Sequence, residues 1–194
     1  GRMTEFLEDQ AFGSETVMID IIGTDERDEK TQFTTEGLLL VLENESALVY
    51  HEIDTEEHVS SKVIIRFDEK NVTVLRGSEP FSSMILRQGQ MCESEYRADG
   101  RSLMLRTFPT EVKVQRNGAR GHMHIVYQVT LSLLGGFAEE TGMRTLDISF
   151  RPAGAPARGK VVKNRAPRGK KGEGAAAQSV TRPAREIAAR ESGL

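Results

Sequence analysis

The sequence GHMHIVYQVTLSL, residues 121–133, alternates between apolar and polar side chains. Its apolar face carries Met123, Ile125, Tyr127, Val129, Leu131 and Leu133. The opposite face is polar except at Val126. A period of two residues is typical of a strand with one buried face, because successive side chains of a strand point to opposite sides. We therefore predict a long, half-buried β-strand here.

The same alternation recurs on both sides of this stretch. Shorter runs of it occur at residues 17–21, 63–67, 103–107, 112–114 and 146–150. The segments at 43–45, 68–71, 98–100 and 116–118 are rich in Asp, Asn and Gly, as hairpin loops are. No segment within residues 14–151 keeps the 3.6-residue apolar period of a helix. Strands joined directly by hairpins predict an antiparallel, all-β domain.

About eight to ten strands of ordinary length fit into residues 14–151. An antiparallel sheet of that size has exposed edges unless it closes or splits into two packed sheets. We predict a closed antiparallel β-barrel.

The charge of the chain is divided unevenly. The 194 residues have a formal net charge of −3. Residues 1–151 carry 16 Lys and Arg against 26 Asp and Glu, a net charge of −10, whereas residues 152–194 carry 10 against 3, a net charge of +7. All eleven Phe and Tyr lie before residue 152, so the remainder lacks the apolar mass for a core. We predict a lead-in at 1–13 with one or two helical turns over 4–12, the barrel at 14–151, and a disordered basic tail at 152–194.

The composition also excludes several classes of protein. The single cysteine, Cys92, rules out an intramolecular disulfide and a zinc site built from several cysteines, and it fits a reducing compartment. No apolar run approaches the roughly 20 residues that a membrane-spanning helix needs. The first residues lack the basic and apolar regions of a secretory signal. We therefore expect a cytoplasmic protein without a membrane span.

A set of residues spread over the predicted barrel resembles a known family. The set comprises Tyr50-His51-Glu52, Arg76-Gly77, Gly89, Tyr96 with Gly100, Thr107, and Gly121 ahead of Ile125-Val126-Tyr127. Their order and spacing resemble the YwiB-like family of uncharacterised bacterial proteins. The resemblance implies a calycin-like, that is lipocalin-like, β-barrel, and it implies no catalytic or ligand-binding residues. Gly77 follows Arg76 directly here, whereas members of the family usually have one residue between the two.

Several polar residues of that set are expected inside the barrel. Residues two apart on a strand share a face, so a polar residue takes the direction of its apolar neighbour. The candidates for an interior ligand site are Arg76, Tyr50, Glu52, Tyr96, Thr107 and Tyr127. An arginine helped by tyrosine hydroxyls can bind a carboxylate or a phosphate. The alternative is a packed interior in which Arg76 pairs with Glu52, because a buried charge needs a partner.

His122 and His124 lie two apart, so their imidazoles share a face, as zinc-binding pairs on strands do. The sequence indicates no third ligand, and both histidines fall on the polar face. We expect two solvent-exposed histidines and no metal site.

Catalytic chemistry finds little support in the sequence. There is no Gly-x-Ser-x-Gly turn, and Cys92 lies near Glu93 and Glu95, whose negative charges disfavour a thiolate. The paired carboxylates at 56–57 and 139–140 are expected to be solvated. We expect neither enzyme activity nor a cofactor.

The predicted tail holds a dense basic cluster. Seven basic residues fall within fourteen positions, without an acidic one: Arg158, Lys160, Lys163, Arg165, Arg168, Lys170 and Lys171. Such a cluster can replace counterions on nucleic acid, with a steep dependence on salt. The alternative is a solubilising tail, or one that lies on the acidic body.

Two functions follow from these patterns. The first is a non-enzymatic binding protein whose barrel interior accepts a small, partly apolar anion. The second is an interaction protein whose basic tail contacts nucleic acid or ribosomes. The sequence does not indicate the oligomeric state.

Overall fold

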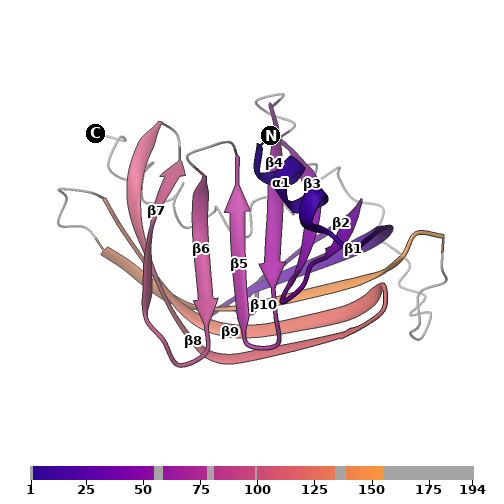
Figure 1. The fold of residues 1–194 in the computed structure, drawn as a ribbon. Coiled ribbons are helices and arrows are strands. Elements are labelled where there is room, and N and C mark those ends of the chain that lie inside the picture. The colour runs from indigo at the N-terminus through magenta and orange to yellow at the C-terminus, as the bar shows by residue number, and fades with distance from the viewer. Residues whose placement is uncertain (1, 55–58, 78–80, 99, 134–138, 155–194) are drawn as a thin grey trace, which may run out of the picture.

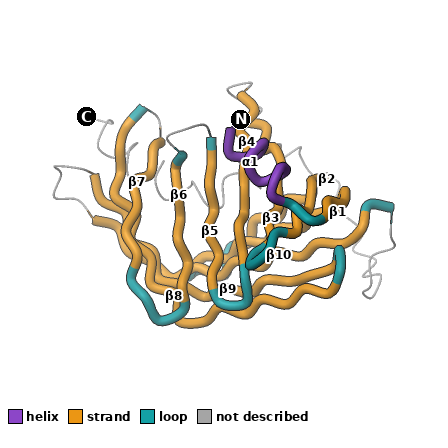
Figure 2. The backbone as a smooth tube through the Cα atoms, viewed as in Figure 1, coloured by secondary structure: helices purple, strands orange, loops and turns teal. Residues whose placement is uncertain are grey.

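The computed structural model describes residues 2–54, 59–77, 81–98, 100–133 and 139–154. These residues form one helix and ten strands (Figures 1 and 2). The helix is α1 (Arg2–Gln10), and the strands are β1 (Gly13–Asp25), β2 (Lys30–Val41), β3 (Ser46–Asp54), β4 (Val59–Phe67), β5 (Asn71–Arg76), β6 (Ser82–Arg87), β7 (Cys92–Ala98), β8 (Arg101–Asn117), β9 (Arg120–Leu133) and β10 (Glu139–Pro152).

All ten strands belong to one antiparallel sheet, in the order β6-β5-β4-β3-β2-β1-β10-β9-β8-β7. The first strand pairs with the last, from Val17 with Pro152 to Asp25 with Arg144. The two ends of the order, β6 and β7, contact each other. The sheet therefore curls into a nearly closed barrel, with β4, β5 and β6 standing in front of the longer β8, β9 and β10 in Figure 1. This confirms the predicted antiparallel barrel of eight to ten strands.

The barrel closes between β6 and β7 without a backbone ladder in the described residues. Side-chain hydroxyls bridge this boundary, which we call the β6–β7 seam. Ser94 Oγ of β7 donates a hydrogen bond to Ser83 O of β6 at 2.6 Å. Thr107 Oγ1 of β8 donates to Ile85 O of β6. The seam therefore depends on particular side chains, unlike the other strand boundaries.

The pairing between β2 and β3 is also incomplete. Their ladder ends at Leu38 and Val49, although each strand continues to pair with its other neighbour. Gly37 comes next, and a Cβ there would lie 2.7 Å from Val49 O and 2.6 Å from Ile19 Cδ1. The two strands thus pass very close together at Gly37 and separate beyond it, toward the end of the barrel where β5 ends at Arg76.

The longest strand joins two runs that the sequence separates. β8 contains both 103–107 and 112–114, and its register with β9 shifts between Pro109 and Glu111. Thr110 is therefore the extra residue of a β-bulge. A bulge tolerates the missing N–H of Pro109, which a regular ladder would need as a donor.

The main core lies in the barrel interior, and every strand contributes to it. The stretch 121–133 lies within β9, where the side chains of Met123, Ile125, Tyr127, Val129 and Leu131 are buried. Its alternate residues face outward, as the period of two predicted. The predicted strand therefore forms one wall of the core.

A second, smaller core lies outside the barrel, under α1 (Figure 1). Leu7 of the helix is 1 % exposed. It packs on the outward-facing side chains Leu40, Ala47, Val49 and Ile64. Lys62 Nζ donates to Thr4 Oγ1 at 2.9 Å and ties the helix to β4. The helix begins two residues before the predicted turns and ends at Gln10.

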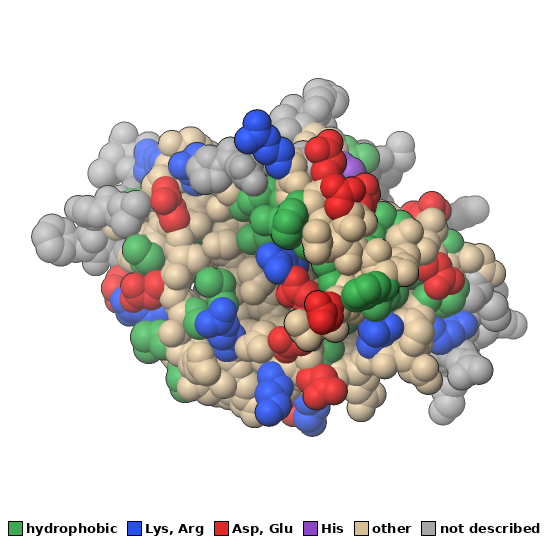
Figure 3. Space-filling model, in the orientation of Figure 1, with side chains coloured by type: hydrophobic (Ala, Val, Ile, Leu, Met, Phe, Trp, Pro, Cys, Tyr) green, Lys and Arg blue, Asp and Glu red, His purple; other side chains and the backbone are tan. Residues whose placement is uncertain are grey.

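The described barrel ends just beyond β10. Ala153 N donates to Thr16 O at 3.1 Å, which continues the contact between β10 and β1 past Pro152. Residues 155–194, which include most of the predicted basic tail, lie outside the described residues. On the face of the barrel that Figure 3 shows, acidic and basic side chains are interspersed around exposed hydrophobic ones.

Candidate functional site

The six interior candidates come from five strands. Tyr50 and Glu52 lie on β3, Arg76 on β5, Tyr96 on β7, Thr107 on β8 and Tyr127 on β9. All six side chains are buried or nearly so. Their inward direction agrees with the strand parity read from the sequence.

Arg76 and Glu52 form an ion pair inside the barrel. Arg76 Nη1 donates a hydrogen bond to Glu52 Oε2, and both side chains are 11 % exposed. Val63 of β4 pairs with Arg76 on one side and with Tyr50 on the other, so these three residues form a row across three strands. The pairing expected for a packed interior is therefore present.

The ion pair leaves two nitrogens of the guanidinium unused. Nε and Nη2 of Arg76 are buried and have no hydrogen-bond partner among the described residues. These two nitrogens present parallel N–H bonds, the geometry that binds a carboxylate or a phosphate through two oxygens. We call them the open fork of Arg76. Leaving a buried donor unpaired costs about 1–3 kcal/mol, which makes the open fork a candidate ligand site.

Arg66 shows the same pair of nitrogens with a partner. On the outside of β4, Nε and Nη2 of Arg66 both donate to Glu45 Oε1, the Nε bond measuring 2.8 Å. This pair is partly solvated, with side-chain exposures of 34 % for Arg66 and 27 % for Glu45. A protein carboxylate therefore fills the fork on the outer wall, whereas the fork of Arg76 inside the barrel is open.

Nearby groups keep Arg76 protonated, and burial keeps Tyr50 and Tyr127 neutral. Burial disfavours the guanidinium, but Tyr96, Glu52 and Tyr50 outweigh burial and raise the pKa of Arg76. Burial raises the pKa of Tyr50, Glu52 adds to the increase and Arg76 opposes it. Burial also raises the pKa of Tyr127 to about 12. At neutral pH, the Tyr50 and Tyr127 hydroxyls are therefore uncharged hydrogen-bond donors.

Thr107 and Tyr127 stand apart from the ion pair. The Thr107 hydroxyl donates to Ile85 O and so serves the β6–β7 seam. Tyr127 interacts electrostatically with Arg144 and with Tyr96. The group that the structure gathers around Arg76 is Tyr50, Glu52 and Tyr96.

Two charged residues on β10 were missed by the sequence analysis. Glu140 and Arg144 have the parity of the buried Leu146 and Ile148, so they belong to the inner face of β10. Oε2 of Glu140 is buried, and the expectation of a solvated carboxylate is wrong for this residue. If the alternation at 146–150 is extended back to residue 140, it places Glu140 and Arg144 on the inner face as well. The other predicted carboxylate pair, 56–57, lies outside the described residues.

A cleft lies on the outer surface of the barrel and borders one residue of the interior group. It has a volume of about 410 Å³ and lies where β2 and β3 separate, with Gly37, Val49, Tyr50 and Lys62 in its lining. Tyr50 also belongs to the main core, where its ring lies 6.1 Å from that of Phe33. The cleft therefore borders Tyr50, which lies in the same row as Arg76.

A larger cleft, of about 740 Å³, lies at the opposite end of the barrel, between the β2–β3 and β4–β5 turns and β8. Two of its carboxylates have structural partners. Glu45 is held by Arg66. Although burial opposes it, hydrogen bonds from Lys70 N and from Asn71 lower the pKa of Asp68. These contacts hold turns in place, so we assign no site there.

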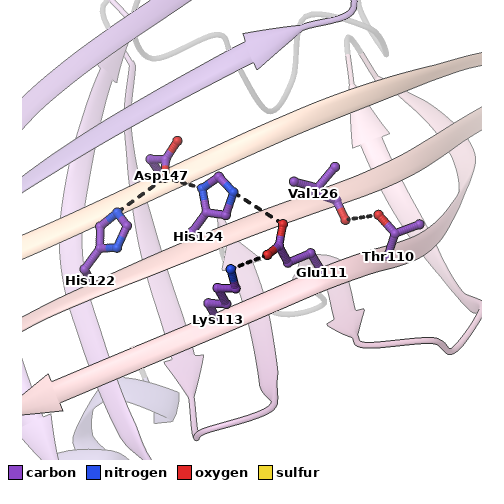
Figure 4. Close-up of polar contacts among 7 residues, drawn as sticks. All are labelled: Thr110, Glu111, Lys113, His122, His124, Val126 and Asp147. Carbon is purple, nitrogen blue, oxygen red and sulfur yellow. Dashed lines mark hydrogen bonds and ion pairs between the residues drawn. The ribbon is translucent and has the colours of Figure 1, made fainter.

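The two histidines of β9 lie on its outer face, in a row of charged side chains (Figure 4). His124 Nδ1 lies 2.6 Å from Asp147 Oδ1, and His122 Nε2 lies 3.3 Å from the same oxygen. On the other side, His124 Nε2 lies 3.7 Å from Glu111 Oε2. A hydrogen bond from Lys113, at 2.6 Å, is the main cause that lowers the pKa of Glu111. Figure 4 shows both imidazoles directed toward Asp147 rather than toward a common metal position.

Within the described ranges, no group of three His, Cys, Asp or Glu side chains is placed to hold a metal ion. The seven basic residues of 158–171 proposed for nucleic-acid contact lie outside those ranges. No helix in the described part of the chain is both long and apolar enough to cross a membrane.

Comparisons with known proteins agree with the barrel. No curated protein matches the chain. The fold is similar to that in the crystal structure of the ywiB protein from Bacillus subtilis, with a TM-score of 0.63 and 18 % sequence identity over 76 % of this chain and 98 % of that one. A family model described as a domain of unknown function, DUF1934, matches residues 17–134. The chain therefore belongs to the DUF1934 family, as its resemblance to YwiB-like proteins implied.

Proposed function

We propose that this protein is a non-enzymatic binding protein that holds a small, partly apolar anion inside its barrel. The observation that supports the proposal most strongly is the open fork of Arg76, a buried guanidinium with two N–H groups that no described residue accepts. Interior polar groups normally have partners. An anion with two oxygens in a plane supplies them.

The surroundings of the fork favour a ligand that is apolar beyond its charged group. Val63 pairs with Arg76, Val74 lies two residues before it on the same face of β5, and Met84 pairs with Val74. All three side chains are buried. A chain of methylene groups extending from the anion therefore meets apolar walls, and its burial contributes about 0.8 kcal/mol for each methylene.

In this proposal the ligand enters at the gap between β2 and β3. The cleft at this gap has Tyr50 in its lining, and Tyr50 lies in the same row as Arg76. The proposal rests on the barrel alone, because the residues proposed for nucleic-acid contact lie outside the described part of the chain.

Isothermal calorimetry with octanoate tests the proposal. We expect octanoate to bind the wild-type protein and its affinity to fall at least about tenfold in Arg76→Ala, which removes the fork. Arg76→Lys keeps the charge beside Glu52 but cannot offer two parallel N–H bonds, so it should also lose affinity. Arg66→Ala is the matched control, since it removes an arginine whose fork is already filled.

The variants separate a ligand role from a structural one. Equal octanoate affinity in the wild type and in folded Arg76→Lys would show that the fork does not hold the anion. Native mass spectrometry of the purified protein adds an independent check, because a ligand acquired during expression should be present in the wild type and absent from Arg76→Lys.

A further inference from the structure

We infer that the interior site accepts singly charged anions and that Glu52 makes it reject doubly charged anions such as alkyl phosphates. This inference rests on the proposed function and specifies the ligand class of the same site. It follows from the charges that face the open fork.

Glu52 already balances the charge of Arg76. The two side chains are in contact, and each is 11 % exposed, so little water screens them from a third charge. An anion on Nε and Nη2 would share the guanidinium with Glu52. Its attraction to Arg76 is therefore largely offset by its repulsion from the Glu52 carboxylate. Hydrogen bonds and apolar contacts remain to hold the ligand.

A second negative charge on the ligand raises the cost of binding more than it raises the attraction to Arg76. The cost of removing an ion from water rises with the square of its charge, whereas its attraction to a fixed cation rises only in proportion. The Tyr50 hydroxyl beside Arg76 is a neutral donor and brings no compensating positive charge. A monoanion can therefore be accommodated where a dianion of the same size is excluded.

A second arginine, Arg144, lies on the inner face of β10. Arg144 Nη1 donates to Met143 O at 3.1 Å. A Cβ at Gly142 would lie 3.1 Å from Arg144 Nη1 and 3.4 Å from Glu26 Oε1, which places this carboxylate close to the guanidinium. The Glu26 carboxylate would therefore oppose a dianion near Arg144, as Glu52 does beside Arg76.

Octyl sulfate and octyl phosphate provide a matched pair of probes. They share a chain and a tetrahedral head group, but at about pH 8.5 the sulfate carries one negative charge and the phosphate two. We expect wild-type protein to bind octyl sulfate more tightly than octyl phosphate, and Glu52→Gln to narrow the difference. Coulomb energy is proportional to charge. If Glu52→Gln raises the affinity for octyl sulfate roughly threefold, it should therefore raise the affinity for octyl phosphate roughly tenfold.

Glu52→Gln preserves the shape of the side chain and an oxygen that accepts from Arg76 Nη1. Its melting temperature is measured beside the wild type to confirm that it is folded. Glu43→Gln is the control, because Glu43 is exposed at the opposite end of the barrel and the substitution removes the same net charge. It should change neither affinity.

The outcomes separate this inference from the proposed function. If Arg76→Lys does not weaken the binding of octanoate or octyl sulfate, the proposed function fails and the inference fails with it. If binding depends on Arg76 but Glu52→Gln changes both affinities by the same factor, the proposed function stands and the role of Glu52 is refuted. Tighter binding of octyl phosphate than of octyl sulfate by the wild type would refute it as well.

Discussion

Tyr127 lies in the barrel interior, where burial raises the pKa of its hydroxyl to about 12. In an unfolded chain tyrosine ionises near pH 10. The folded protein therefore retains the proton at pH values where the unfolded chain loses it, so this contribution to stability is complete below about pH 10 and is lost as the pH rises toward 12. We expect the contribution of Tyr127 to the free energy of unfolding to fall by about 2–3 kcal/mol over that interval.

Denaturant titrations at a series of alkaline pH values measure this loss, and tyrosinate absorbance follows the ionisation directly. Tyr127→Phe should remove part of the pH dependence of the free energy of unfolding. The rest should remain, because the pKa of Tyr50 is also raised. Native protein in which all three tyrosines ionise near pH 10, as they do in denaturant, would contradict the burial of these hydroxyls.

At the residue scale, the sequence predicted the direction of side chains better than their contacts. Parity places Tyr50 and Glu52 inside because both follow Leu48 at intervals of two. The contact between Glu52 and Arg76 was one of two alternatives, and the structure contains it. The open fork was not predictable, because the nitrogen that Glu52 takes depends on the torsions of two long side chains.

At the scale of elements, the β6–β7 seam should depend on the Thr107 hydroxyl. Thr107 is 1 % exposed, and its Oγ1 donates to Ile85 O across the seam. Thr107→Val keeps the shape but removes the donor, which leaves the carbonyl without this hydrogen bond. We expect it to lower the free energy of unfolding by about 1–3 kcal/mol, measured by denaturant titration, and to speed hydrogen exchange in β6.

Thr141→Val is the control, since the Thr141 hydroxyl is exposed on β10 and meets only the hydroxyl of Thr130 among its described hydrogen bonds. It should change the free energy by less than about 0.5 kcal/mol. The same variants decide the role of Thr107. If Thr107→Val loses stability but keeps its affinity for octanoate, Thr107 serves the β6–β7 seam. If it keeps its stability but loses affinity, Thr107 contacts the ligand instead.

Elements were predictable where the pattern was local. The period of two identified the strand at 121–133 because one face is buried along almost its whole length. The β8 bulge separated two runs that belong to one strand, since Thr110 shifts the parity between them. The covering helix had a signal too: residues 38–42 and 63–65 are apolar on both faces of their strands, which indicates that something packs outside the barrel.

At the scale of the whole molecule, the sequence predicted closure of the sheet. It did not predict where neighbouring strands in the described part of the chain lack backbone pairing, between β6 and β7 and over part of β2 and β3. Closure follows from the number of strands and the need to protect edges. The β2–β3 gap and the β6–β7 seam depend on contacts between distant residues, such as Gly37 with Val49 and Thr107 with Ile85. The β2–β3 gap and the β6–β7 seam both lie in the wall around the polar group of Arg76, Glu52 and Tyr50. A uniformly apolar core would not contain such a group.

The central claim is that the open fork of Arg76 receives the charged group of a ligand. The most direct measurement is a side-chain nitrogen–proton NMR spectrum of the arginines during a titration with octanoate. The Arg76 Nε–H resonance should move downfield and saturate with the binding isotherm, because it gains a charged acceptor. The Arg66 Nε–H resonance, already bonded to Glu45, should stay in place. Octanoate binding that leaves the Arg76 resonance unmoved, or no binding at all, would contradict the account.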